Sequence, residues 1–114
     1  KAIRFYTDVL GFKKKHDIPA GEYRWITVTS PEGPDDVELA LEPNANPAGK
    51  TFQEAMFKQG IPLAAFEVSD IKGEFARLTA EGVAFLRPPA QAGPVTFAVF
   101  ADTCGNLIQL YQPS

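Results

Sequence analysis

The 114-residue chain contains a single cysteine, Cys104, so no disulfide can form within it. Scarcity of cysteine is typical of proteins kept in a reducing compartment, and we expect a cytoplasmic location. Long apolar runs are also missing. No stretch approaches the roughly 20 residues needed to cross a bilayer, so we expect no membrane partner.

Positive charge is in short supply as well. The chain has 11 Lys and Arg residues against 14 Asp and Glu residues, which gives a formal net charge of −3. A nucleic-acid-binding domain usually presents a basic face, so we expect no nucleic-acid partner. The one basic run, Lys13-Lys14-Lys15, is too short to follow a phosphate backbone and is expected to be a solvated strand end.

Aromatic residues, in contrast, are plentiful: nine Phe, three Tyr and one Trp. The length is that of one domain, and a hydrophobic content of 45% is ordinary for a globular chain. Aromatic side chains of this number can fill a core or line an apolar pocket. The composition therefore predicts one globular domain spanning residues 1–114.

Three segments have features typical of helices and are each followed by a glycine: 1–10, 52–59 and 71–81. Thr51 with Glu54 matches a capping box ahead of the second helix, and Asp70 is a good N-cap for the third. A linker rich in Pro and Asn is expected over residues 43–50.

Seven segments are predicted as strands: 12–18, 23–29, 37–42, 63–68, 83–86, 95–101 and 107–112. Turns are expected at 19–21, 30–35 and 102–106, and Arg87-Pro88-Pro89 is expected to end the fifth strand.

This order of elements is a repeat of pattern. Gly11 and Gly82, which end two of the helices, lie 71 residues apart, as do Glu38 and Gln109. The second half begins with a strand whose counterpart in the first half is expected to lie before Lys1. The sequence therefore predicts an α+β domain of two modules, residues 1–50 and 61–114.

Four motifs carry a resemblance to a known family: Ala-Ile-Arg-Phe-Tyr-Thr-Asp-Val-Leu-Gly-Phe at 2–12, Val-Glu-Leu at 37–39, Phe-Glu-Val-Ser-Asp at 66–70, and Asp-Thr-Cys-Gly-Asn-Leu-Ile-Gln-Leu at 102–110. Together with the repeat, they resemble the glyoxalase/bleomycin resistance protein/dioxygenase (vicinal oxygen chelate) superfamily. The resemblance implies paired βαβββ modules that form a curved open sheet around a cleft. That cleft lies within one chain or across a homodimer, and a homodimer is expected.

The resemblance also implies where a divalent metal (Ni, Zn, Mn or Fe) would bind, since each module offers one ligand from its first strand and one from its fourth. Glu38 and Gln109 occupy the two fourth-strand positions. Leu63 stands where a histidine is usual, and the remaining position is expected before Lys1. This set falls below the three strong ligands of a catalytic zinc site. Alternatively, Glu38 pairs with a base such as Arg24 or Arg77, and Gln109 is an ordinary hydrogen-bonding residue.

Large aromatic side chains on a concave sheet bind flat apolar ligands by stacking. Trp25 is the strongest candidate of this kind. The other residues expected to face the cleft are Tyr23, Phe97, Val99 and Tyr111. Alternatively, these side chains pack the two modules together. His16, the only histidine, is expected to be a titrating surface group, and Cys104 is expected to be a passive thiol.

Three functions remain open from the sequence. The first is binding or metal-independent turnover of a small organic molecule in an aromatic cleft, with Glu38, the candidate catalytic carboxylate, and Gln109 as polar contacts. The second is a metal-dependent lyase or dioxygenase of the glyoxalase I type that keeps Glu38 as a ligand. The third is a non-catalytic dimer that sequesters a drug.

Overall fold

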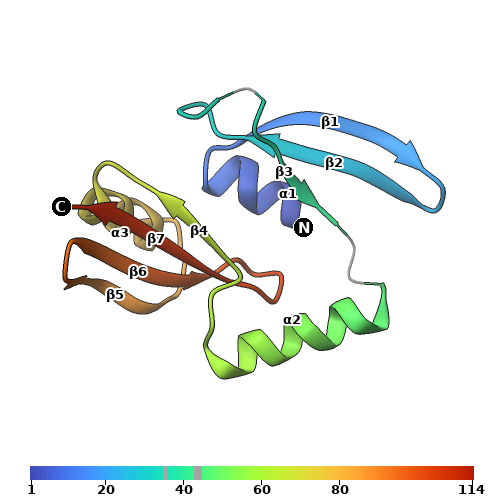
Figure 1. Ribbon diagram of the computed structural model, residues 1–114. Helices are drawn as coiled ribbons and strands as arrows, with labels where there is room; N and C mark the ends of the chain where they lie inside the picture. Colours follow the sequence, from blue (N-terminus) through green and yellow to red (C-terminus); the bar gives the residue numbers. More distant parts are fainter. Residues whose placement is uncertain (35, 43–44) are drawn as a thin grey trace. The chain divides into compact units, whose positions relative to one another are not determined.

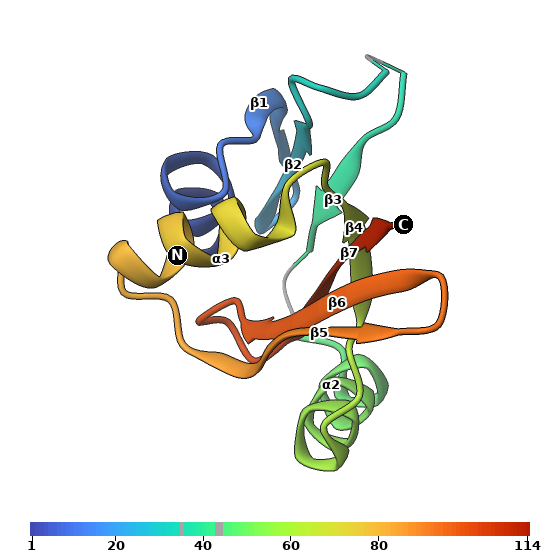
Figure 2. The same ribbon diagram turned by 90° about the vertical axis from the view of Figure 1, so that its left-hand side faces the viewer.

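The computed structural model describes residues 1–34, 36–42 and 45–114. The chain has an α+β architecture, as expected, and divides into two compact units, residues 1–47 and 48–114 (Figures 1 and 2). Within the described residues, none of the helices combines the length and the apolar character needed to span a membrane.

The first unit consists of a helical segment and a three-stranded antiparallel sheet. Helix α1 (Ala2–Arg4) runs directly into the π-helical turn η1 (Phe5–Val9), and Gly11 ends the segment with a φ of +85°. The sheet follows the order β1 (Lys13–Ala20), β2 (Tyr23–Thr29), β3 (Leu39–Leu41). Its core includes Val28, which is fully buried, and the buried edge-to-face pair Phe5–Tyr6 of the helical segment.

The second unit contains a complete βαβββ module. Helix α2 (Pro47–Gln59) precedes β4 (Ala64–Glu67), α3 (Ile71–Ala80), β5 (Phe85–Ala92), β6 (Val95–Ala101) and β7 (Leu107–Pro113). The strands lie in the order β4-β7-β6-β5, with β4 parallel to β7 and the other pairs antiparallel. The antiparallel run β5-β6-β7 matches β1-β2-β3 of the first unit in both order and direction, so the structure contains the repeat that the sequence predicts.

Helix α3 packs on one face of the second sheet through phenylalanine rings. Phe75 of α3 meets Phe85 at a centroid distance of 4.8 Å, and Phe85 meets the fully buried Phe100 at 5.4 Å. Helix α2 contacts the loop before β7 through polar groups. Gln53 Nε2 donates hydrogen bonds to the carbonyl of Cys104 (3.0 Å) and to Asn106 Oδ1 (2.7 Å).

Prolines end fewer strands than the sequence predicts. The turn expected at 19–21 is wrong, because β1 continues through Pro19 to Ala20 and the turn is Gly21-Glu22. The break expected at Pro88-Pro89 is also wrong, because β5 runs through both residues with two register shifts. Both strands lie at a sheet edge, where a missing N–H need not break a ladder hydrogen bond, so proline is tolerated there.

Other boundaries differ from the prediction as well, and the fifth strand starts at Phe85 and not at residue 83. Helix α2 begins at Pro47, not at residue 52, because proline is well suited to the first helical position. The capping box of Thr51 and Glu54 is therefore wrong, since both residues lie inside the helix. The predicted strand 37–42 is shorter in the structure, where β3 spans Leu39–Leu41. Asp35 of the predicted turn, and Pro43 and Asn44 of the predicted linker, lie outside the described residues.

The predicted cap of α3 is confirmed, since Asp70 Oδ1 accepts a hydrogen bond from the Gly73 amide at 3.1 Å. We expect Asp70→Ala to lower the free energy of unfolding by about 1 kcal/mol, because the amide loses its partner. Chemical denaturation followed by circular dichroism measures this change. Glu54→Ala is the control. It is exposed within α2 and should change stability by less than about 0.5 kcal/mol. An equal loss in both variants would contradict the assigned cap.

Candidate functional site

One face of the first sheet carries Tyr23 and Trp25, two of the residues expected to contact a ligand. The register pairs Ile18 with Trp25 and Ala20 with Tyr23, so these side chains lie on the same side of the sheet. We call it the Trp25 face. Three of its large side chains remain about half exposed: Ile18 at 51%, Tyr23 at 47% and Trp25 at 46%. Exposed aromatic surface of this kind is available for ligand contact.

A β-bulge at Lys15 brings a histidine onto the same face. Lys14 pairs with Val28 and His16 with Thr27, so two successive partners on β2 are matched by residues two apart on β1. Strand alternation would otherwise turn His16 to the opposite side, because side chains change face at every residue. The bulge therefore places His16 beside Thr27, next to Trp25.

Glu38 reaches the same place from the segment that leads into β3. Its Oε1 atom accepts hydrogen bonds from Thr27 Oγ1 at 2.7 Å and from His16 Nδ1 at 2.8 Å. Thr27 is buried, at 1% exposure, and its hydroxyl oxygen also lies 3.3 Å from His16 Nδ1. The three side chains form a connected polar cluster, which we call the His16–Glu38 cluster.

The surroundings of the cluster favour the charged form of Glu38. The hydrogen bond from Thr27 is the main reason that the pKa of Glu38 lies below its ordinary value, and the bond from His16 adds to it. Lys15 Nζ lies 3.8 Å from Glu38 Oε2 and contributes a smaller attraction. Glu38 is thus an ionised carboxylate at neutral pH, and hydrogen bonds from Thr27 and His16 fix its orientation.

The basic partners considered for Glu38 from the sequence are wrong. Arg24 bonds to Asp17, and Arg77 bonds to Glu74 at 2.9 Å on the surface of α3. Arg24 is on the opposite face of β2 from Trp25 and Thr27, because it differs from each by an odd number of positions. Its pairing with Asp17, together with a weaker bond from Lys14, lowers the pKa of Asp17.

The candidate residues of the second unit also share one sheet face. Phe97 pairs with Tyr111, and Val99 pairs with Gln109. This face lies opposite the one that presents Phe100 to α3. Val99 is buried, whereas Phe97, Gln109 and Tyr111 are half-buried.

The residue directly opposite Gln109 on the parallel strand is Ala65, and Leu63 lies just before β4. Neither side chain has an atom that can coordinate a metal. Within residues 1–34, 36–42 and 45–114, no group of three or more His, Cys, Asp or Glu side chains is placed to hold a metal ion. His16 and Glu38 could each supply one metal ligand, but there are only two of them and they hydrogen-bond to each other. The side chains present therefore do not fit the three-ligand site of the metal-using members.

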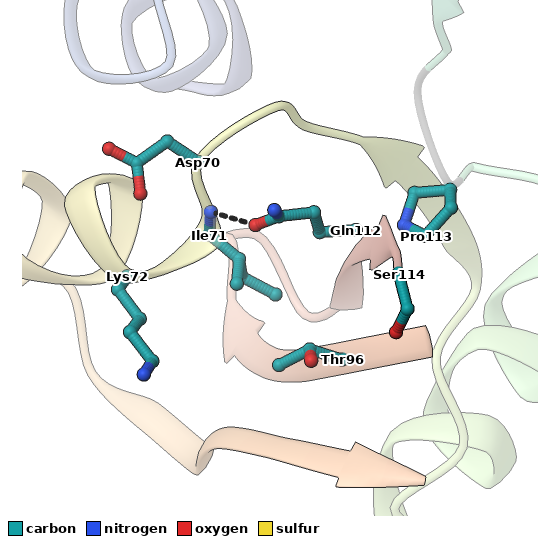
Figure 3. Close-up of a pocket in the computed structure, with 7 residues that line it drawn as sticks. All are labelled: Asp70, Ile71, Lys72, Thr96, Gln112, Pro113 and Ser114. Carbon is teal, nitrogen blue, oxygen red and sulfur yellow. Dashed lines mark hydrogen bonds between the residues drawn. The ribbon is translucent and has the colours of Figure 1, made fainter. Parts of the chain in front are cut away.

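A separate hollow of about 290 Å³ lies at the first turn of α3 and contains none of the expected site residues (Figure 3). Gln112 of β7 fills a structural role in it, since its Oε1 atom accepts a hydrogen bond from the Ile71 amide at 2.8 Å. Cys104 lies half-buried in the loop before β7, where its amide donates to Asp102 Oδ1 at 2.8 Å. We assign neither place a part in the candidate site.

His16 and Thr27 are the members of the site that sequence reasoning missed. His16 lies among lysines and 22 residues from Glu38, and nothing in the local pattern marks the bulge that turns it. The alternation of β2 does place Thr27 on the face of Trp25, but a threonine in that position is an ordinary strand residue.

Thr27→Val tests the electrostatics of the cluster. Removing the hydroxyl should raise the pKa of Glu38 toward its ordinary value. A carboxyl group whose pKa is lower in the folded state than in the unfolded state stabilises the fold at pH values above its unfolded-state pKa. This stabilisation is lost as the pH falls through the pKa of the folded state. The variant should therefore lose less stability on acidification. The carbon-13 NMR titration of the Glu38 carboxyl carbon measures the pKa, and Thr29→Val on the same strand is the control. An unchanged Glu38 titration in Thr27→Val would contradict the assigned bond.

Comparison with known proteins gives a consistent picture over nearly the whole chain. The family model described as Glyoxalase/Bleomycin resistance protein/Dioxygenase superfamily matches residues 1–110. The uncharacterized protein YurT of Bacillus subtilis (strain 168) is 52% identical over 111 residues, which cover 97% of this chain and 87% of YurT.

Two solved structures are similar in both fold and sequence. UcmS2 is 32% identical, with a TM-score of 0.79, and the match covers 96% of this chain and 86% of UcmS2. TnmS3, an antibiotic binding protein from Streptomyces sp. CB03234, is 29% identical, with a TM-score of 0.77, and the match covers 100% of this chain and 85% of TnmS3. With its two related units, its closing motif and these matches, the chain belongs to the glyoxalase/bleomycin resistance protein/dioxygenase superfamily.

Proposed function

We propose that this protein binds a small, flat organic molecule on the Trp25 face, and that it does so without a complete metal site. The observation that carries the proposal is the exposure of Trp25 and Tyr23 near Glu38, a carboxylate that is fixed by hydrogen bonds. An aromatic platform supplies contact area, and a few fixed polar groups orient the ligand. The similarity to TnmS3, an antibiotic binding protein, supports a ligand of drug-like size.

Gln109, Phe97 and Tyr111 are proposed as ligand contacts from the second unit. They belong to the sheet face that α3 does not cover, and they keep part of their surface exposed. The amide of Gln109 can both donate and accept hydrogen bonds, while the two rings offer apolar area. We propose that residues 1–50 and 61–114 act as two modules of one ligand-binding domain, in a cytoplasmic protein that sequesters its ligand.

Two other activities remain as alternatives to simple binding. One is turnover of the ligand without a metal, with Glu38 as the catalytic carboxylate. The other is a lyase or dioxygenase that uses Ni, Zn, Mn or Fe, which would require ligands beyond Glu38 and Gln109. We favour sequestration because Glu38 already accepts two hydrogen bonds within the first unit and TnmS3 is a binding protein.

Trp25→Ala tests the aromatic platform. We expect it to weaken binding of a planar aromatic antibiotic by about tenfold, which corresponds to about 1.4 kcal/mol, because a stacking surface is lost. Trp25→Phe should retain much of the affinity. Isothermal titration calorimetry measures the ligand affinity of each variant. In the unmodified protein, quenching of the single tryptophan reports on this face directly.

Phe52→Ala provides the matched control for this experiment. Phe52 is an exposed aromatic residue of α2 and is not among the proposed ligand contacts, so its removal should leave the affinity unchanged. Equal losses in Trp25→Ala and Phe52→Ala would contradict a specific role for the Trp25 face.

Native mass spectrometry of the purified protein tests the metal and the assembly together. We expect the mass of two copies, since the family resemblance implies a homodimer, and no stoichiometric metal ion, since the ligand set is incomplete. Elemental analysis of the same sample for Ni, Zn, Mn and Fe identifies any ion present. One ion per chain would replace the proposal with the metal-dependent alternative, and a monomer would remove the homodimer from it.

A further inference from the structure

We propose that His16 is a specificity-determining residue whose Nε2 atom accepts a hydrogen bond from a hydroxyl group on the ligand, so that the Trp25 face selects hydroxylated aromatic compounds. This inference rests on the proposed function, because it names the ligand class of the same face. It concerns hydrogen bonding alone and involves no covalent step.

The hydrogen bond to Glu38 sets the tautomer of the imidazole. An ionised carboxylate can only accept, so the 2.8 Å contact between His16 Nδ1 and Glu38 Oε1 requires the proton to be on Nδ1. In the neutral ring, Nε2 then carries a lone pair and is an acceptor. The carboxylate thus orients the ring and, while the ring is neutral, leaves Nε2 as the acceptor, as it does when a histidine is held in place for function.

The Nε2 atom is available to a ligand. Both hydrogen-bond contacts of the His16 ring involve Nδ1, and no residue in the described part of the chain bonds to Nε2. The His16 side chain is 41% exposed. An exposed acceptor held in one orientation loses little freedom on binding, which favours its use in recognition.

The distance between His16 and Trp25 suits a small aromatic molecule. His16 pairs with Thr27, which lies two residues from Trp25, so His16 and Trp25 are diagonal neighbours on one face. Such neighbours are separated by about 7–8 Å, a gap that aromatic side chains can reach across. A ring stacked on Trp25 can therefore direct a substituent toward His16.

Charge near His16 favours a neutral hydroxyl over a carboxylate on the ligand. Glu38 bonds directly to the ring and repels an anion, and Lys15, at 3.8 Å from Glu38, offsets that charge only in part. Thr27 cannot replace His16 as the acceptor, since it is buried and its hydroxyl donates to Glu38. A phenol or enol, which donates without carrying charge, fits this combination of groups.

Two probes that differ by one methyl group test the inference. The unmodified protein should bind 2-naphthol about three- to tenfold more tightly than 2-methoxynaphthalene, since a neutral hydrogen bond contributes about 0.5–1.5 kcal/mol. Calorimetry measures both affinities. His16→Phe should abolish this preference, so that the ratio of the two affinities falls to about one, and Lys13→Ala, at the start of the same strand, should retain the preference.

The outcomes separate this inference from the proposed function. Equal affinities for the two probes in the unmodified protein would overturn the role of His16 and leave the aromatic face intact. Failure of both probes to bind, or binding that Trp25→Ala does not weaken, would overturn the proposed face itself.

A measurement on the unmodified protein keeps the inference falsifiable if His16→Phe does not fold. His16 is the only histidine, so nitrogen-15 NMR of histidine side chains reports on it alone. We expect the Nδ1-protonated tautomer, with an Nε2 shift that changes on addition of 2-naphthol and much less with 2-methoxynaphthalene. A ring that carries a proton on Nε2 would overturn the inference.

Discussion

The extra residue at Lys15 controls the chemistry of the first sheet. Side chains change face at every position of a strand, so one unpaired residue in β1 reverses the orientation of everything beyond it. His16 and Ile18 consequently lie with Trp25, while Asp17 lies on the opposite side with Arg24. A regular strand would separate the imidazole from Glu38 and place the Asp17 carboxylate beside the aromatic platform.

The two units use the same strand arrangement with different side chains. Each has an antiparallel run of three strands. Glu38 lies directly before the last of these strands in the first unit, and Gln109 lies within the last of them in the second. The first unit adds a polar cluster to exposed rings, whereas the second offers an amide between half-buried rings. The repeat thus supplies a common frame, and the individual side chains decide what each face can bind.

The sequence predicted those parts of the fold that depend on local pattern. Strands β2 and β6 have the predicted bounds because alternation and turn residues mark both ends. Errors arose at Pro19, Pro88 and Pro89, because proline breaks an inner strand but not an edge strand, and position in a sheet is a property of the whole fold.

The candidate site was predicted only in part for a related reason. Trp25 and Glu38 could be proposed from strand alternation and from the family resemblance. The contact between His16 and Glu38 spans 22 residues and depends on a bulge, which has no signature in residues 13–18. Register is fixed by pairing with a neighbouring strand, so a single strand read in isolation does not reveal it.

The prolines within β1 and β5 also bear on how the protein avoids self-association through its sheets. A sheet edge exposes unpaired N–H and C=O groups to which another strand can add. Pro19 lies on the β1 edge of the first sheet, and Pro88 and Pro89 lie on the β5 edge of the second sheet. Each of these residues lacks an N–H. Lysines 13–15 add charge at the start of the first of these edges. Fibre-like growth by strand addition is therefore discouraged along β1 and β5, although both strands are eight residues long.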